Sequence, residues 1–403
     1  MSSYDYYDLG PDPYISTYVS DSDSTDGGPI TCRFPEHNNW EIWFMIIIVV
    51  FTLILIVFST KPAIPDNRTI DDGLQIKVDS LATHLLEKLP EVQTVYTVVL
   101  EGDGAVRALV YKEKHNNNIV SHQDSLEKGE RIYHGIIQAP INLMLMQNDG
   151  IFLSLAQKIP TNNGMIWPME QNDSCIVNYE TNESDTLITI RTGMAMGSKY
   201  VICALADHYY WHFPGEMYYK LMDLFPDCDP GLPAGFHSRR RELHYAQIVA
   251  TGNCYRIAPL DIASVYHAIA SGGFSKKPYC YLDDAENGIE ICSKSIADSL
   301  LTLLDCSKDP HNSDYWKFRD FPMQVWGKSA TVNNYTEPMW EDEMAESDIF
   351  VGSIIQKDIA TTVYVYIQYS QGKSTHEQNA VQLFKSIIPY VSPNENLEVC
   401  KKS

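Results

Sequence analysis

Few residues of this chain have the type and spacing that catalysis or metal binding requires. Asp207 and His208 could form an acid–base pair, but neighbours on a helix point about 100° apart, so we do not expect them to act together. Residues 102–104 read Gly-Asp-Gly, which is typical of a turn and is too short for a phosphate loop. Four histidines lack the tight spacing of metal ligands: His134, His208, His212 and His237. We therefore predict no metal and no cofactor.

An apolar run near the N-terminus predicts a membrane anchor. Residues 42–58 read IWFMIIIVVFTLILIVF and carry no charge; with Ser59 and Thr60 they approach the roughly 20 residues that span a bilayer. A cleaved signal peptide would need a basic start, a shorter apolar stretch and a small-residue cleavage site, and none of these is present. We predict one transmembrane helix over residues 42–60.

The anchor divides the chain into unequal parts. Residues 1–41 form an acidic, tyrosine- and serine-rich tail with too few apolar residues for a core, so we expect disorder; phosphorylation, binding of sorting adaptors and mere solvation all remain open for it. Residues 61–73 read as a linker and 396–403 as a C-terminal tail. Residues 74–395 remain for one large folded domain.

The basic residues beside the anchor barely decide its orientation, but two other patterns favour a type II protein, with a cytoplasmic tail and an extracellular or lumenal domain. Beyond the anchor lie four glycosylation sequons, at Asn67, Asn172, Asn182 and Asn334. An even set of cysteines there suits disulfide formation, with buried free thiols as the other reading. These are Cys175, Cys203, Cys228, Cys254, Cys280, Cys292, Cys306 and Cys400.

The net charge of −22 argues against nucleic-acid binding, since no basic stripe offsets it. We expect the partners to be the membrane, in which the chain is integral, and a protein or peptide of unknown identity. An oligomer is possible.

The pattern of the large domain predicts an α+β fold. Residues 79–89 have apolar side chains at helical spacing, and residues 95–100 and 105–111 read as a β-hairpin. Residues 348–355 and 359–369 look like a second strand pair, followed by a helix over residues 376–391. Strands at both ends with helices between them indicate a sheet built from distant parts of the chain.

Two stretches resemble the transpeptidase domain of penicillin-binding proteins, and the resemblance extends from about residue 74 to residue 391. Residues 256–274 read RIAPLDIASVYHAIASGGF, which is similar to the family's SPLDLASAYATFANGG; we expect a Pro-started helix with Ile262, Ala263, Tyr266 and Ile269 inward. Residues 325–331, VWGKSAT, and 347–352, SDIFVG, resemble the family's GKTGT and DAWFVG strands. Residues 74–89 resemble the family's opening phrase, a strand leading into a helix. The resemblance implies an antiparallel five-stranded sheet flanked by helices, with a helical subdomain.

The resemblance fails at the catalytic centre. The family's nucleophilic serine and its lysine match Ile136 and Ala139, which cannot form an acyl-enzyme or move a proton. The family's second motif matches His208 and Tyr210 instead of Ser and Asn. The resemblance implies carboxylate binding by Lys328, Ser329 and Thr331, although Ala330 replaces a glycine.

We therefore interpret the chain as a pseudoenzyme, a membrane glycoprotein whose transpeptidase-like domain binds a protein or peptide or has a structural role. The substrate groove that the resemblance implies, called the old groove below, would either be open to a partner or be filled by the protein's own side chains. Its lining would be Ile136, Ala139, Tyr210, Lys328, Ser329 and Thr331. The alternatives are an acyl-transferase or hydrolase with a relocated nucleophile, recognisable by a reactive serine close to Lys328, and a non-catalytic cell-wall or division scaffold.

Overall fold

The computed structural model describes most of the chain after the predicted anchor. The described residues belong to one compact unit, Asp66–Ser403. They are residues 67–115, 118–122, 132–133, 136–147, 155–160, 187–210, 214–225, 250, 256–334, 345–370 and 378–391.

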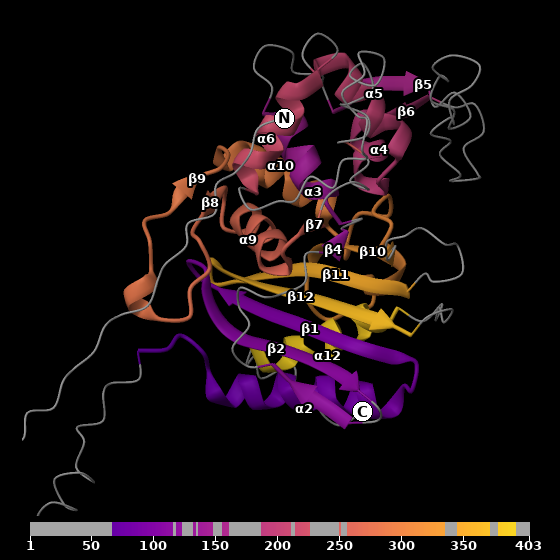
Figure 1. Cartoon of the computed structure of the whole chain (residues 1–403). Helices are drawn as coiled ribbons and strands as arrows, with labels where there is room; N and C mark the ends of the chain where they lie inside the picture. The colour runs from indigo at the N-terminus through magenta and orange to yellow at the C-terminus, as the bar shows by residue number, and fades with distance from the viewer. Residues whose placement is uncertain are drawn as a thin grey trace, which may run out of the picture. The chain divides into compact units, whose positions relative to one another are not determined.

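A six-stranded antiparallel sheet forms the centre of this unit (Figure 1). Its order is β10 (Trp326–Asn334), β11 (Ala345–Gln356), β12 (Ile359–Tyr369), β1 (Val92–Glu101), β2 (Ala105–His115) and β3 (Asn118–Ser121). Both expected strand pairs are confirmed, and they join through β1 and β12. The expected number of five strands is wrong, because the sheet has a sixth strand, β3. The sequence analysis missed β3, because its four residues lie in a polar stretch without alternating apolar residues.

The sheet is buried on both faces, so alternate residues of each strand enter different cores. In β1, Val95 and Val99 belong to one apolar cluster, whereas Val98 and Leu100 belong to the other. The turn from β11 to β12 consists of Lys357 and Asp358, with φ of 49° and 64°. Two left-handed residues match the right-handed twist of a tight hairpin.

Two helices cover one face, α2 (Asp72–Lys88) and α12 (Asn379–Val391) (Figure 1). The side chain of Asp71 caps α2 by accepting from the Leu74 N–H at 2.9 Å. The helix therefore includes residues 74–79, where the family resemblance implied a strand. That expectation is wrong, because Val78, Ala82 and Leu86 form one helical stripe that packs on the sheet.

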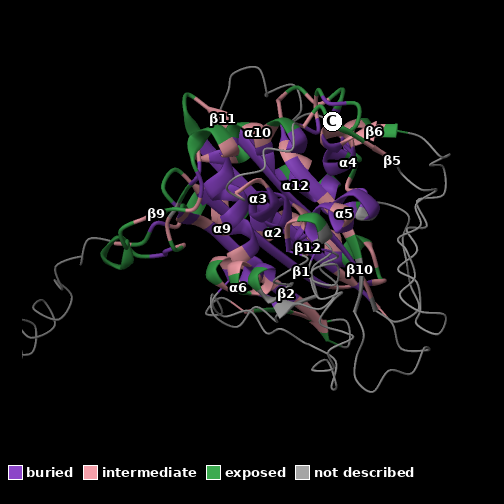
Figure 2. Cartoon of the chain, turned by 90° about the horizontal axis from the view of Figure 1, so that it is seen from above, coloured by how far each residue is buried: buried purple, intermediate pink, exposed green. Residues whose placement is uncertain are grey.

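The opposite face carries the helical part of the domain. Its main elements are α3 (Gln138–Met146), α4 (Ile190–Met196), α5 (Lys199–Tyr210), α6 (Pro214–Leu224), α9 (Pro259–Ala270) and α10 (Lys294–Leu304). Figure 2 shows α3 and α9 among the buried elements of this part. The expected inward face of α9 is confirmed, since Ile262, Ala263, Tyr266 and Ile269 are all buried.

Gly272 and Gly273 end α9. Their φ angles are +80° and +95°, and the Gly273 N–H reaches back to the Ala268 carbonyl at 2.8 Å. A Cβ on Gly273 would lie 2.1 Å from the Cys292 carbonyl oxygen. Glycine is required here by the close approach as well as by the backbone conformation.

Short elements complete the description. They are β4 (Ile132–Tyr133), β5 (Lys158–Pro160), β6 (Leu187–Thr189), β7 (Arg256–Ile257), β8 (Phe274–Ser275), η2 (Leu282–Asp284), β9 (Ile289–Glu290) and α11 (Tyr315–Phe318).

Four of the eight cysteines expected to form disulfides lie in the described residues, and the structure does not support the expectation for three of them. Cys280, Cys292 and Cys306 are buried free thiols, as in the other reading of the sequence, and Cys203 is buried as well. All four lie in the apolar cores, where a thiol packs as a small apolar group. The remaining four lie outside the described residues: Cys175, Cys228, Cys254 and Cys400.

The anchor and two sequons also lie outside the description. No described helix is both long and apolar enough to cross a bilayer, and residues 42–60 are not among those described. Asn172 and Asn182 are likewise outside it. Asn334 ends β10, and the Asn67 amide donates to the Asp283 carboxylate.

Candidate functional site

Ile136 and Ala139, which the sequence resemblance aligns with the family's serine and lysine, lie in the core. Ile136 comes just before α3 and Ala139 lies in its first turn, and both side chains have an exposed fraction of 0%. The Tyr266 hydroxyl of α9 donates to the Ile136 carbonyl oxygen at 3.1 Å, which fixes the start of α3 against α9. Neither position presents a polar atom of its side chain to a substrate.

The two positions of the second motif point in different directions. Tyr210 ends α5 and is 1% exposed; its hydroxyl donates to the Met144 carbonyl at 3.4 Å. The Lys220 ammonium of α6 lies 5.4 Å from the Tyr210 ring centroid. His208, two positions before Tyr210 on the same helix, is exposed. The structure therefore does not bring His208 and Tyr210 together as one catalytic pair.

Lys328 is the one charged candidate that the structure holds inside this region. It lies on β10, is 7% exposed, and donates from Nζ to the Ser313 hydroxyl at 2.8 Å and to the Met196 carbonyl at 3.3 Å. Met196 ends α4, so the lysine ties the sheet to the helical part. Thr331, three residues further along β10, is exposed.

Ser329 faces a different partner, the buried carboxylate of Asp314. Asp314 accepts from the Ser329 backbone N–H at 2.7 Å and from its hydroxyl at 2.5 Å, and forms an ion pair with Lys317 at 2.5 Å. Burial alone would raise the pKa of Asp314, but the charges of Lys317 and Lys328 and these hydrogen bonds lower it below its usual value. Asp314 is therefore a buried anion with several donors, a residue that the sequence analysis did not identify.

These contacts also occupy part of the outer edge of the sheet. β10 is an edge strand, and the outward backbone groups of such a strand are where a peptide can add as a further strand. Here the Ser329 N–H is bonded to Asp314, and the Cys306 thiol donates to the Gly327 carbonyl at 3.1 Å. A bridge between Asp305 and Trp326 extends the same cover. Between residues 326 and 329, the chain's own segment 305–314 takes the place of a bound peptide.

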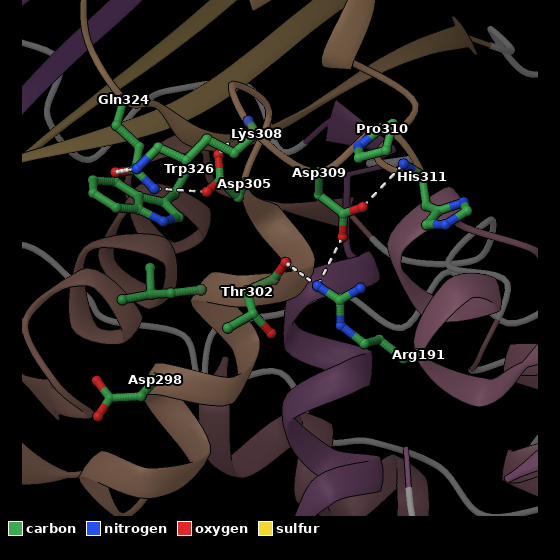
Figure 3. Close-up of a pocket in the computed structure, with 11 residues that line it drawn as sticks. Arg191, Asp298, Thr302, Asp305, Lys308, Asp309, Pro310, His311, Gln324 and Trp326 are labelled. Atoms are coloured by element: carbon green, nitrogen blue, oxygen red, sulfur yellow. Dashed lines mark hydrogen bonds and ion pairs between the residues drawn. The ribbon is translucent and has the colours of Figure 1, made fainter. Parts of the chain in front are cut away.

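A surface pocket of about 580 Å³ lies beyond this cover, between α4, α10 and the segment that follows α10 (Figure 3). Arg191 crosses it and pairs with Asp309 at 3.0 Å. On the other side, Gln324 donates to Asp305 at 2.6 Å and accepts from Lys308 at 2.7 Å. The pocket has charges of both signs and the aromatic ring of Trp326 in its wall. It contains none of the positions that the sequence analysis selected.

One cluster of possible metal ligands lies elsewhere in the described residues, at the hairpin of β2 and β3. Glu113, His115 and His122 offer ligand atoms within 4.8 Å of one another. The sequence analysis missed them because it considered other histidines. The signal was present, since Glu113 and His115 are two positions apart on one strand and therefore share a face.

The comparisons with known proteins bear on the fold. No family model and no curated protein matches the chain. The TP domain of penicillin-binding protein 3 from Burkholderia pseudomallei has a TM-score of 0.61 and 15% identity over 82% of this chain and 96% of that one. A peptidoglycan glycosyltransferase from Burkholderia ambifaria has a TM-score of 0.59 and 17% identity over 81% and 99%.

Penicillin-binding protein 2B from Streptococcus pneumoniae R6 has a TM-score of 0.62 and 16% identity over 81% of this chain. The match spans 60% of that longer chain. The described domain therefore has the α+β fold of penicillin-binding-protein transpeptidase domains, and identities this low establish the fold alone.

Proposed function

We propose that this chain is a single-pass type II membrane glycoprotein whose transpeptidase-like domain binds a protein or peptide without catalysing acyl transfer. The observation that carries the proposal is the complete burial of Ile136 and Ala139, the residues that the sequence resemblance aligns with the family's serine and lysine. A nucleophile must be reached by its substrate, and these side chains are packed among other apolar groups.

The cover on β10 supports the same proposal. A substrate peptide that paired with this edge would have to displace Asp314 from the Ser329 N–H and Cys306 from the Gly327 carbonyl. Breaking a buried hydrogen bond of an ionised group costs about 1.5–3 kcal/mol, so displacement is unfavourable. Of the three binding residues carried over from the family, only Thr331 is exposed. We therefore place the partner surface outside the old groove.

The pocket between α4 and α10 is the partner surface that we favour. Its lining presents side chains of both charges with an indole ring, which suits a polypeptide with charged and apolar groups. The ion pair of Arg191 with Asp309 gives such a partner a fixed, partly buried polar centre.

Acylation is the direct test of the non-catalytic proposal. The full-length protein should remain unlabelled by a fluorescent penicillin and by a fluorophosphonate, and its intact mass should not change. A stoichiometric adduct would overturn the proposal. The membrane part is tested in parallel, since glycosidase treatment should lower the mass and protease added to intact cells should remove the domain but spare the tail.

A second candidate function rests on one contact, the Ser313 hydroxyl at 2.8 Å from Lys328 Nζ. Ser313 is exposed, and a serine beside a lysine is the arrangement of a relocated nucleophile and its base. We rank it second because Lys328 Nζ donates to the Ser313 hydroxyl, whereas a base has to accept the proton of the serine. Under this alternative the fluorophosphonate would label the wild-type protein, and Ser313→Ala would abolish labelling while Ser307→Ala would not.

A further inference from the structure

We propose that Glu113, His115 and His122 form a binding site for a divalent transition-metal ion of the zinc class, at the edge of the sheet opposite β10. Two imidazoles and one carboxylate are a common ligand set for such ions, with a further position left for water.

Backbone pairing brings the three residues together. Glu113 and His115 lie two positions apart on β2, so their side chains leave the same face. His122 follows β3 directly, and its backbone N–H donates to the Tyr111 carbonyl at 2.9 Å. The β2–β3 hairpin therefore supplies all three ligands through local contacts.

The ligand atoms have nearly the separations that a metal ion requires. Nε2 of His115 lies 2.9 Å and Nε2 of His122 lies 3.4 Å from the same Glu113 oxygen, Oε2. Bonds of about 2.0–2.2 Å in a tetrahedral site place neighbouring ligand atoms roughly 3.4 Å apart. An ion could therefore enter after small side-chain rotations.

The surroundings orient and charge the site. The Tyr111 hydroxyl donates to the other oxygen of Glu113, Oε1, which leaves Oε2 toward the histidines. Burial would raise the pKa of Glu113, but the hydrogen bonds from Tyr111 and His115 and the charges of His122 and His115 lower it below its usual value. The Tyr111 and His122 ring centroids lie 4.9 Å apart.

The two lysines that flank Glu113 on β2 point away from the ligands. Lys112 and Lys114 alternate with them along β2 and face α2 instead, where Lys112 pairs with Asp79 at 2.9 Å and Lys114 donates to the Leu86 carbonyl at 3.1 Å. The ligand side chains are 23%, 63% and 37% exposed for Glu113, His115 and His122, so an ion can reach them from solvent.

A bound ion would join β2 to the residue after β3. β3 has only four residues and forms the sheet edge, so it has few ladder hydrogen bonds of its own. We expect the ion to stabilise this edge, with a role separate from the old transpeptidase positions beside β10.

Cobalt provides the test, because a tetrahedral Co²⁺ site absorbs visible light. The full-length protein, freed of metal by a chelator, is titrated with Co²⁺ and then with Zn²⁺ as competitor. We expect one equivalent with the visible bands, displaced by Zn²⁺, and an affinity at least about tenfold lower in Glu113→Gln and His122→Ala. The matched control is His84→Ala, an exposed histidine on α2, which should bind as the wild type.

The variants are checked for folding by circular dichroism, and the thermal midpoint gives a second readout. Zn²⁺ should raise the midpoint of the wild type and of His84→Ala but not of Glu113→Gln, because only an ion bound to the folded state stabilises it. Equal Co²⁺ affinity in all four proteins would assign binding to other residues and overturn the proposal, as would the absence of binding to the wild type.

Discussion

Protonation of His267 should destabilise the fold in mild acid. The imidazole lies buried between α9 and the sheet, where Nε2 donates to the Gly102 carbonyl at 3.1 Å. A carbonyl only accepts, so Nδ1 carries no hydrogen and accepts from the Thr362 hydroxyl at 3.0 Å. Burial lowers the pKa of His267 to about 4.

The sign follows from the two states. The unfolded chain binds the proton at a pKa of about 6.5 and the folded chain only near 4, so the unfolded state gains protons first as the pH falls. The shift is worth roughly 3 kcal/mol in full, and about 2 kcal/mol of it is lost between about pH 7 and about pH 4.5. The His267 contribution is present above the unfolded pKa.

Asp348 acts in the opposite direction over the same range. Its carboxylate accepts from the Ala380 N–H at the start of α12, but burial raises its pKa to about 6. The folded state therefore binds this proton more tightly, and acidification from about pH 7 to about pH 4.5 adds about 2 kcal/mol. The two residues nearly cancel in the wild type, so only variants separate them.

The assay is urea unfolding of the full-length protein and of His267→Gln at both pH values. The stability difference between the two proteins should shrink by about 2 kcal/mol on acidification, because the glutamine does not titrate. Asp348→Asn should reveal the loss directly, and His84→Gln, an exposed control, should follow the wild type. A wild-type-to-His267→Gln difference that stays constant with pH would refute the reasoning.

Three other predictions follow from buried positions. Ala139→Lys should lower the free energy of unfolding by several kcal/mol, measured by urea titration, because the ammonium would enter an apolar core. Glu87→Lys, at an exposed position of α2, is the matched comparison, and equal losses would contradict the placement of Ala139. Gly273→Ala should lower the free energy of unfolding by roughly 3 kcal/mol, because of backbone strain and the clash with Cys292. Gly102→Ala, with open space around its Cβ, should lower the free energy of unfolding by less. Burial raises the pKa of Cys280 and of Cys292 to about 11, so iodoacetamide should modify them only in denaturant, and peptide mapping that finds them labelled in the native protein would contradict this.

Local patterns predicted the parts of the fold whose contacts are local. In the β1–β2 hairpin and the β11–β12 pair, β1 and β12 are rich in β-branched and aromatic residues and each is joined to its neighbour by a short turn, so the local pattern was sufficient. The helix α9 was marked by Pro259 at its start and two glycines after its end. β3 has no such signal, and residues 74–79 read as a strand only through the family phrase.

The sequence could not predict the environment of the candidate site. Asp314 and Ser329 are 15 positions apart, and nothing in their spacing indicates that one caps the backbone of the other. Likewise, the even number of cysteines suggested disulfides, but pairing depends on distances between chain segments that a count does not contain. The sequence likewise could not predict that Ile136 is buried, since the old groove could have been empty or filled.

The apolar core at α3 and the covered edge of β10 support the non-catalytic proposal in different ways. Core burial concerns the nucleophile, whereas the Asp314 and Cys306 contacts concern the backbone edge on which a peptide would align. Restoring a serine and a lysine on α3 would leave the covered edge of β10 unchanged. We therefore expect Ile136→Ser with Ala139→Lys to give no penicillin adduct even if the variant folds, because its serine would remain buried. An adduct on that variant would mean that the groove opens. The replacement of two side chains would then be the whole difference between this protein and an acylating enzyme.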